Sequence, residues 1–129
     1  DAIDKAQIRC SQDIFNQLFP LLQDLPHEEF WALFLNRANK IIAQIKISQG
    51  GTDGTVVDTR LILKLALDKL ASGIAICHNH PSGNRTPSEN DIKITKKIKT
   101  ACLAVDIAFL DHVIIAGNDY YSFADENIL

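Results

Sequence analysis

The chain has 129 residues, of which 47% are hydrophobic and 22% are charged, and its formal net charge is -3. These values favour one compact domain with a real core, and we expect no second domain. No apolar stretch reaches the ~20 residues that a membrane helix needs, and no secretory signal precedes the domain. The sequence therefore argues against a membrane protein, and its acidic balance argues against strong nucleic-acid binding.

Hydrophobic periodicity predicts alternating helices and strands. In the first half of the chain we expect a short strand over 7–10, a helix from 11 towards 23, and two strands over 30–35 and 41–47. The polar residues 36–40 predict a hairpin turn between the two strands. The apolar face of the helix would contain Ile14, Leu18 and either Leu21 or Leu22.

The second half continues this alternation after a glycine-rich loop over 50–54. Asp58 or Thr59 caps a helix that we expect to run to about Ala71. After this helix we expect a buried strand over 73–77 and a helix beginning at Ser88. We then expect strands over 106–110 and 113–115, followed by a turn over 117–119 and a strand over 120–123. This order predicts an α/β fold with one mixed sheet flanked by helices.

The three cysteines, Cys10, Cys77 and Cys102, are an odd number without any paired spacing. A reducing compartment is the simpler interpretation, so we expect a cytoplasmic protein. The chain begins at Asp1 rather than Met, so it is either trimmed or the C-terminal part of a longer protein.

The residues that can carry chemistry concentrate between His78 and Asp91. His78 and His80 lie two apart at the end of a predicted strand, so both would face the same side and can share one ion. Cys77 would face the opposite side, and we interpret it as a small buried residue. Ser88 and Asp91 are typical of a helix start with a capping box, which would bring Asp91 back toward the histidines.

Two imidazoles and one carboxylate suit Zn²⁺, and three protein ligands leave a fourth position open, as in catalytic zinc sites. For Ser88 and Asp91 alone, a plain helix cap explains the spacing as well as a metal site does. Their combination with the His-x-His pattern after a buried strand favours the metal site.

The order His78-Asn79-His80, seven residues, Ser88, two residues, Asp91 resembles the JAMM motif of JAB/MPN-type metalloproteases. The wider sequence is similar to the RadC branch of that superfamily over about residues 7–129, in the segments His78–Gly83, Pro87–Asp91, Leu110–His112 and Tyr121–Phe123. The resemblance implies a JAB/MPN fold, which is a cytidine-deaminase-like mixed sheet flanked by helices. RadC-like proteins often carry an additional N-terminal helical segment, which we expect to be missing here.

The resemblance also implies the roles of individual residues. His78, His80 and Asp91 would be the zinc ligands, and Ser88 would support the bound water or the developing oxyanion. Zinc lowers the pKa of a bound water toward ~7 and polarises a substrate carbonyl, so the implied reaction is hydrolysis of an amide or isopeptide bond.

A site of this family also needs an upstream glutamate as general base, usually five positions before an apolar residue. Glu28, five positions before Leu33, fits this pattern best, and Glu29 is the alternative. Adjacent strand residues face opposite sides, so only one of the two glutamates can reach the metal.

We therefore predict a zinc-dependent peptidase or isopeptidase that acts on a peptide or protein. The alternative is a non-catalytic MPN-like interaction module attached to DNA-repair or mobile-element machinery, because the RadC name is associated with DNA repair. The full ligand set favours the enzyme, since a scaffold has no chemical need for an open zinc beside a base. A metal-dependent nuclease is less favoured, because two-metal phosphodiester chemistry normally uses a cluster of acidic residues.

Three further features have structural interpretations. The lysines of the helix after Ser88 can contact phosphates, but no aromatic residues are interleaved, which favours a solvated helix face: Lys93, Lys96, Lys97 and Lys99. We interpret His112 as a hydrogen-bonded structural histidine, with contact to the metal ligands or the substrate as the alternative. A homodimer through an exposed strand or helix is compatible with the sequence.

Overall fold

The computed structural model describes residues 6–50 and 56–129, and these residues form three helices and five strands. In chain order they are α1 (Ser11–Leu22), β1 (Glu29–Leu35), β2 (Ile41–Gln49), α2 (Thr59–Asp68), β3 (Gly73–Asn79), α3 (Glu89–Ala104), β4 (Ala108–Ala116) and β5 (Asp119–Ser122). None of the helices in this described part of the chain has the length and apolar character needed to span a membrane.

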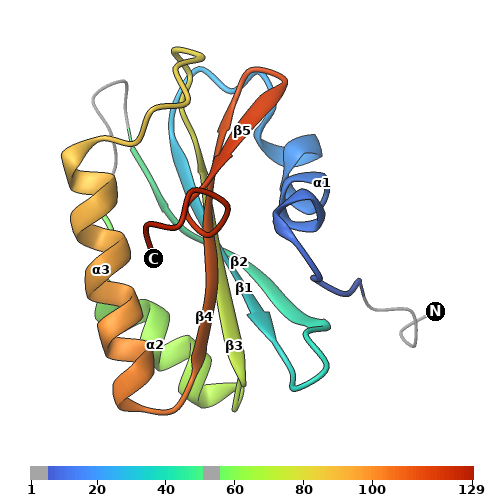
Figure 1. The fold of residues 1–129 in the computed structure, drawn as a ribbon, viewed down its shortest axis with the longest axis vertical. Coiled ribbons are helices and arrows are strands. Elements are labelled where there is room, and N and C mark those ends of the chain that lie inside the picture. Colours follow the sequence, from blue (N-terminus) through green and yellow to red (C-terminus); the bar gives the residue numbers. More distant parts are fainter. Residues whose placement is uncertain (1–5, 51–55) are drawn as a thin grey trace.

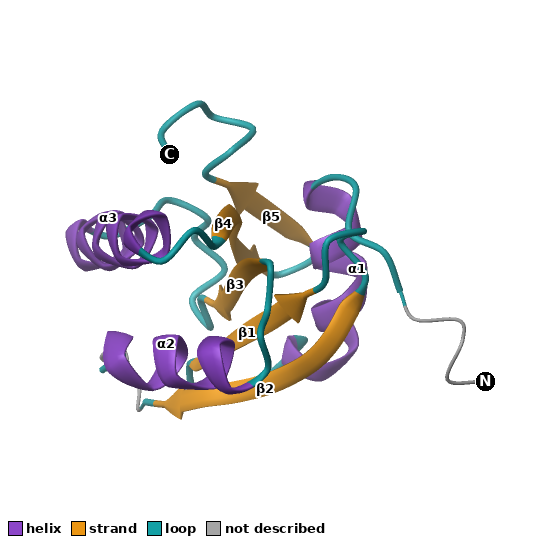
Figure 2. Cartoon of the chain, turned by 90° about the horizontal axis from the view of Figure 1, so that it is seen from below, coloured by secondary structure: helices purple, strands orange, loops and turns teal. Residues whose placement is uncertain are grey.

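The five strands form one sheet in the order β2-β1-β3-β4-β5. Strands β3 and β4 are parallel and are joined through α3, whereas the other neighbours are antiparallel. Helices α2 and α3 cover one face of the sheet, and α1 covers the other (Figures 1 and 2). The predicted α/β class, with a mixed sheet flanked by helices, is therefore confirmed.

Strand β3 lies at the centre of the sheet, and all seven of its residues are buried. A strand with neighbours on both sides and helices on both faces needs a continuous apolar run, which Gly73–Cys77 supplies. Ile74 and Ile76 pack in the core beneath α2 and α3, whereas Ala75 and Cys77 pack in the core beneath α1. The prediction that Cys77 faces away from His78 is confirmed, and burial raises the pKa of the Cys77 thiol.

The predicted hairpin over 30–47 is also present, as β1 and β2. Its turn is stabilised by Asn36, whose side-chain oxygen accepts hydrogen bonds from the backbone N–H groups of Ala38 and Lys40, both at 3.0 Å. Asn39 adopts the left-handed conformation with φ 60°, which asparagine tolerates better than most residues. The turn chemistry thus agrees with the sequence pattern.

Helix α1 begins at Ser11, where we predicted it. The N-cap is Cys10, which makes no side-chain cap, and Asp13 instead accepts a hydrogen bond from the backbone N–H of Arg9. Of the two candidate core leucines, Leu22 is buried and Leu21 is 45% exposed. The predicted strand over 7–10 is wrong, because only one isolated bridge, Gln7 to Lys40, forms there.

Helix α2 has Asp58 as its N-cap, with the side chain accepting from the N–H of Arg60, and it ends at Asp68 rather than at Ala71. The glycine-rich loop predicted over 50–54 lies, apart from Gly50, outside the described residues.

The two strands predicted over 106–115 are one strand, β4. Asp111 and His112 interrupt the apolar pattern, but both are buried inside the strand. The Asp111 carboxylate accepts hydrogen bonds from the Ser122 hydroxyl at 2.6 Å and from the backbone N–H groups of His112 at 2.7 Å and Ala124 at 2.9 Å. The strand continues because these donors replace the water that an aspartate normally needs, although burial still raises the pKa of Asp111.

Candidate metal centre

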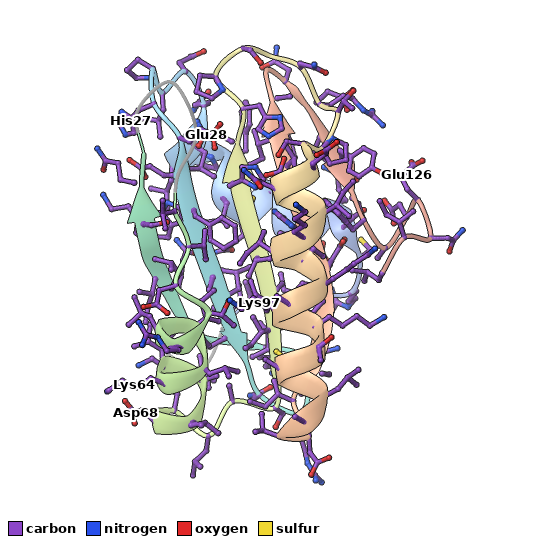
Figure 3. All side chains as sticks on the ribbon, turned by 90° about the vertical axis from the view of Figure 1, so that its left-hand side faces the viewer. His27, Glu28, Lys64, Asp68, Lys97 and Glu126 are labelled. Carbon is purple, nitrogen blue, oxygen red and sulfur yellow. The ribbon has the colours of Figure 1, made fainter. Side chains whose placement is uncertain are left out.

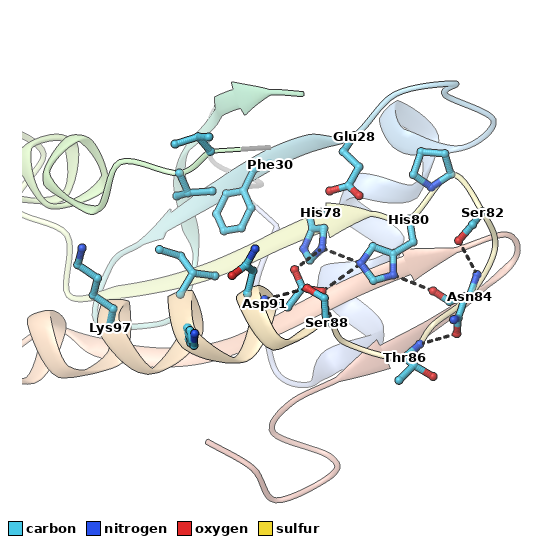
Figure 4. Close-up of a pocket in the computed structure, with 16 residues that line it drawn as sticks. Glu28, Phe30, His78, His80, Ser82, Asn84, Thr86, Ser88, Asp91 and Lys97 are labelled. Atoms are coloured by element: carbon cyan, nitrogen blue, oxygen red, sulfur yellow. Dashed lines mark hydrogen bonds and ion pairs between the residues drawn. The ribbon is translucent and has the colours of Figure 1, made fainter. Parts of the chain in front are cut away.

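The side chains of three residues lie close together at the carboxyl end of β3: His78, His80 and Asp91. One nitrogen of each imidazole and one carboxylate oxygen lie within 4.8 Å of one another (Figure 4). The two Nε2 atoms are 3.0 Å apart, and they lie 3.2 Å and 3.1 Å from the two oxygens of Asp91. The structure therefore brings together the three residues that the sequence predicted as ligands.

These separations fit a single metal ion. Zinc bonds to nitrogen and oxygen of about 2.0–2.1 Å in a tetrahedron place neighbouring ligand atoms about 3.3 Å apart. The separations of 3.0, 3.1 and 3.2 Å between the three side chains are close to this value. Two nitrogens and one oxygen at this spacing form a donor set that suits a divalent transition metal.

The orientation of His80 is set by the loop that follows it. Its Nδ1 lies 2.7 Å from the backbone oxygen of Asn84, and since a carbonyl oxygen can only accept, Nδ1 must carry the hydrogen. In a neutral ring this leaves the lone pair on Nε2, which faces the cluster. The loop is held in turn by Gly83, which has φ 82° and donates from its N–H to the backbone oxygen of His80 at 3.0 Å.

Asp91 is held by the predicted capping box at the start of α3. The Ser88 hydroxyl accepts from the N–H of Asp91 at 3.0 Å, and the Asp91 carboxylate accepts from the N–H of Ser88 at 2.8 Å. The carboxylate lies in the first turn of the helix, where the helix dipole favours negative charge. Within the described part of the chain, the structure shows no acceptor for the Ser88 hydroxyl hydrogen.

The ionisable groups of the cluster shift one another's pKa values. Burial raises the pKa of Asp91, but hydrogen bonds from His78 and His80 outweigh this effect and hold the pKa well below its usual range. Burial lowers the pKa of His80, but the hydrogen bond to Asp91 outweighs this and raises the pKa above its usual value. Both shifts mean that the His80 imidazole and the Asp91 carboxylate stabilise each other's charged forms.

His78 is buried, and it contacts a second buried histidine. Its Nδ1 lies 2.8 Å from Nε2 of His112, and Nδ1 of His112 lies 2.6 Å from the hydroxyl of Thr95. Burial lowers the pKa of His112 well below its usual value. His112 is therefore a hydrogen-bonded histidine, as predicted, but it touches a candidate ligand. The role of Thr95 was not predicted, although it lies one helical turn after Asp91.

The two candidate bases lie on opposite sides of β1. Phe30 pairs with His78 across the sheet, so Glu28, two residues earlier, lies on the face of the histidines. Glu28 lines the cleft, and its carboxylate points toward His78 and His80 (Figure 4). The carboxylate of Glu29 instead binds His27 at 2.8 Å and Trp31 at 3.0 Å. The geometry thus favours Glu28 as the candidate base.

The cluster opens into a cleft of about 930 Å³. Beyond the histidines and Asp91, an apolar part of the wall is formed by Phe30, Val56, Val57 and Ile94. Lys93 and Lys97 also line the cleft, and Lys97 extends from α3 toward α2 (Figure 3). The four lysines of this helix were predicted to form a solvated face, but two of them face the cleft.

A family model described as a RadC-like JAB domain matches residues 8–128 of the chain. The chain belongs to the RadC-like JAB family. It is 51% identical over 128 residues to a UPF0758 protein of Flavobacterium johnsoniae, covering 99% of this chain and 56% of the relative. It is 43% identical over 127 residues to a UPF0758 protein of Porphyromonas gingivalis, covering 97% and 56%, respectively. A UPF0758 protein of Listeria monocytogenes is 39% identical over 123 residues, covering 95% and 55%.

The predicted family is confirmed by these matches. The RadC-like JAB domain described here spans about half the length of the curated relatives it matches. The matched range contains the His78, His80 and Asp91 cluster, so the family and the geometry agree on a site that can hold a metal.

Metal content tests the cluster directly. We expect purified RadC-like JAB domain to contain about one divalent metal ion per chain, and His80→Ala and Asp91→Ala to lose it, because each removes one of the three candidate ligands found among the described residues. Elemental analysis of protein prepared without chelator measures this. His27→Ala is the matched control, since His27 binds Glu29 on the other side of β1 and should leave the metal content unchanged.

Proposed function

We propose that this domain is a zinc-dependent metallohydrolase of the JAMM type that cleaves a peptide or isopeptide bond. The observation that carries the proposal is that two imidazole nitrogens and one carboxylate lie at the separations expected for ligands of one tetrahedrally coordinated ion. A second carboxylate, that of Glu28, faces them in an open cleft. A structural zinc site is normally closed by four protein ligands. Three ligands beside a cleft suit catalysis.

His78, His80 and Asp91 would hold the zinc ion through nitrogen and carboxylate oxygen, a ligand set that zinc accepts. When bound, zinc supplies a Lewis acid that polarises a carbonyl and makes water a better nucleophile at neutral pH.

Glu28 would act as the general base. Its carboxylate faces the cluster from the position just before β1, on the cleft side, so it can take a proton from the attacking water and return it to the leaving amine. Ser88 would donate its hydroxyl hydrogen to the oxyanion that forms on the substrate carbonyl. The Ser88 oxygen already accepts from the N–H of Asp91, and its hydrogen has no acceptor among the described residues.

The wall of the cleft indicates the kind of substrate. Phe30, Val57 and Ile94 provide an apolar surface next to the ligands, and Lys93 and Lys97 provide positive charge beside it. A peptide segment with an apolar residue and a nearby acidic group matches both features. The net charge of the chain is -3, so this positive charge is local.

A first prediction concerns the base. Glu28→Gln should keep its zinc and lower kcat/KM for a cleavable peptide by ~10²–10⁴, the usual contribution of a general base. The substrate would come from a peptide-library hydrolysis screen, and zinc would be measured in the same sample. Glu29→Gln is the matched control and should retain activity. Equal activity of both variants would contradict the assignment, and a folded wild-type domain without bound metal would leave an interaction module as the better account.

A second prediction concerns the hydroxyl of Ser88. Ser88→Gly should lower kcat by on the order of 10²-fold, because it removes one donor to the oxyanion. Glycine is a good N-cap residue, so the helix should lose only a few tenths of a kcal/mol. Thermal unfolding checks the helix, and Ser88→Thr, which retains both cap and hydroxyl, should keep much of the activity. Unchanged kcat in the glycine variant would exclude this role.

A third prediction concerns substrate charge. Lys97→Glu should lower kcat/KM by about threefold to tenfold for peptides with an acidic residue and much less for neutral peptides, because the exposed lysine makes a solvent-screened ion pair. Lys96→Glu makes the same charge change one residue away, outside the cleft lining, and should have little effect. Added salt should reduce the difference. The same response in both variants would argue against a specific contact.

A further inference from the structure

A buried series of hydrogen bonds leads away from the metal cluster into the fold. His78 Nδ1 lies 2.8 Å from His112 Nε2, His112 Nδ1 lies 2.6 Å from the Thr95 hydroxyl, and this hydroxyl donates to the backbone oxygen of Asp91 at 2.6 Å. His78, His112 and Thr95 are each at most 2% exposed. Because the carboxylate of Asp91 belongs to the cluster, the series starts and ends at the same candidate metal centre.

The direction of these hydrogen bonds follows from their last member. A backbone carbonyl has no hydrogen to donate, so the single hydrogen of the Thr95 hydroxyl must point to the oxygen of Asp91. The lone pairs of Thr95 then face His112 Nδ1, which must therefore carry a hydrogen. The reverse direction would leave two acceptors in contact at 2.6 Å between Thr95 and Asp91.

The direction of the hydrogen bond between His112 and His78 follows because His112 is neutral. It is 0% exposed, and its ring is stacked on Phe123 with centroids 4.8 Å apart and packed edge-on against Phe30 at 5.7 Å. A charge would be costly between these apolar rings. A neutral imidazole has only one N–H group, so Nε2 of His112 accepts, and His78 must donate to it from Nδ1. The lone pair of His78 is then on Nε2, facing His80 and Asp91.

We propose that Thr95 and His112 are positioning residues that hold His78 in the tautomer with hydrogen on Nδ1, so that Nε2 is oriented as a metal ligand. This inference rests on the proposed metal centre. His80 needs no such series, because one carbonyl oxygen, that of Asn84, fixes its tautomer directly. His78 lies in the interior of the sheet, and its orientation is fixed by side chains from α3 and β4.

The C-terminal part of the chain holds His112 in this role. The Asp111 carboxylate accepts from the N–H of His112 at 2.7 Å and from the Ser122 hydroxyl at 2.6 Å. The N–H of Phe123 donates to the backbone oxygen of His112 at 3.0 Å, and the Phe123 ring covers the imidazole. The segments Leu110–His112 and Tyr121–Phe123 therefore meet at His112.

Metal affinity is the first test. Thr95→Val keeps the shape of the side chain but removes the hydroxyl, and we expect it to weaken zinc binding by about 10–100-fold, the usual effect of losing the hydrogen-bond partner that orients a ligand. Thr95→Ser keeps the hydroxyl and should bind within about threefold of wild type. Competition with a chromophoric chelator measures the affinities, and thermal unfolding verifies that both variants are folded. Equal zinc affinity of the valine and serine variants would overturn the proposal.

His112 offers a second pair of variants. His112→Gln has both a donor and an acceptor in its amide and should preserve part of the zinc affinity, whereas His112→Phe fills the aromatic site without either group and should lose it. Retention of wild-type affinity in the phenylalanine variant would show that the site needs only packing.

The tautomer can be observed without metal. At a pH where the imidazoles are neutral, ¹⁵N-detected ring correlations should show His78 with hydrogen on Nδ1 in the wild type and a mixture of both tautomers in Thr95→Val. A mixture in the wild type would overturn the proposal. If the wild type shows the expected tautomer but binds no zinc, the hydrogen-bond series stands and the proposed metalloenzyme fails, so the two failures are distinguishable.

Discussion

Groups that all carry lone pairs face one another at the end of β3, and much of the fold serves to keep them there. The Nε2 atoms of His78 and His80 are 3.0 Å apart, and both lie close to the carboxylate of Asp91. Such a cluster is repulsive unless a proton or a metal ion lies between its members. A hydrogen bond outside the cluster therefore orients each member. His80 is oriented by a loop carbonyl, Asp91 by the capping box, and His78 by His112.

The sheet topology explains how residues from distant parts of the chain reach this cluster. Strand β3 lies between β1 and β4, so β1 and the residue before it bring Phe30 and Glu28 to one side of the histidines, and β4 brings His112 to the other. Because β3 and β4 are parallel, the chain must return through a crossover helix, and that helix begins near the carboxyl end of β3. Asp91, in the first turn of α3, is placed at the cluster by this requirement.

Local rules made part of the site predictable. The side chains of His78 and His80 share a face because strands have a period of two, and the capping box of Ser88 and Asp91 follows from a three-residue spacing. The choice of Glu28 depended on a resemblance, because its approach to the histidines requires the pairing of β1 with β3. Thr95 could not be predicted from spacing alone, since its contact with His112 depends on how α3 packs over β4.

Buried polar residues explain both the wrongly predicted break in β4 and the part of the site that was not predicted. The pattern in β4 was interrupted by Asp111 and His112, and this led to the prediction of two strands where there is one. Buried polar residues cost free energy unless every donor and acceptor is matched, and well-packed apolar residues often stabilise a core at least as well. Stability alone therefore does not account for the buried polar side chains of Thr95, Asp111 and His112. His112 bonds to His78, Thr95 bonds to His112, and Asp111 holds the backbone of His112, so we interpret the departure of β4 from the apolar pattern as a requirement of the candidate metal centre.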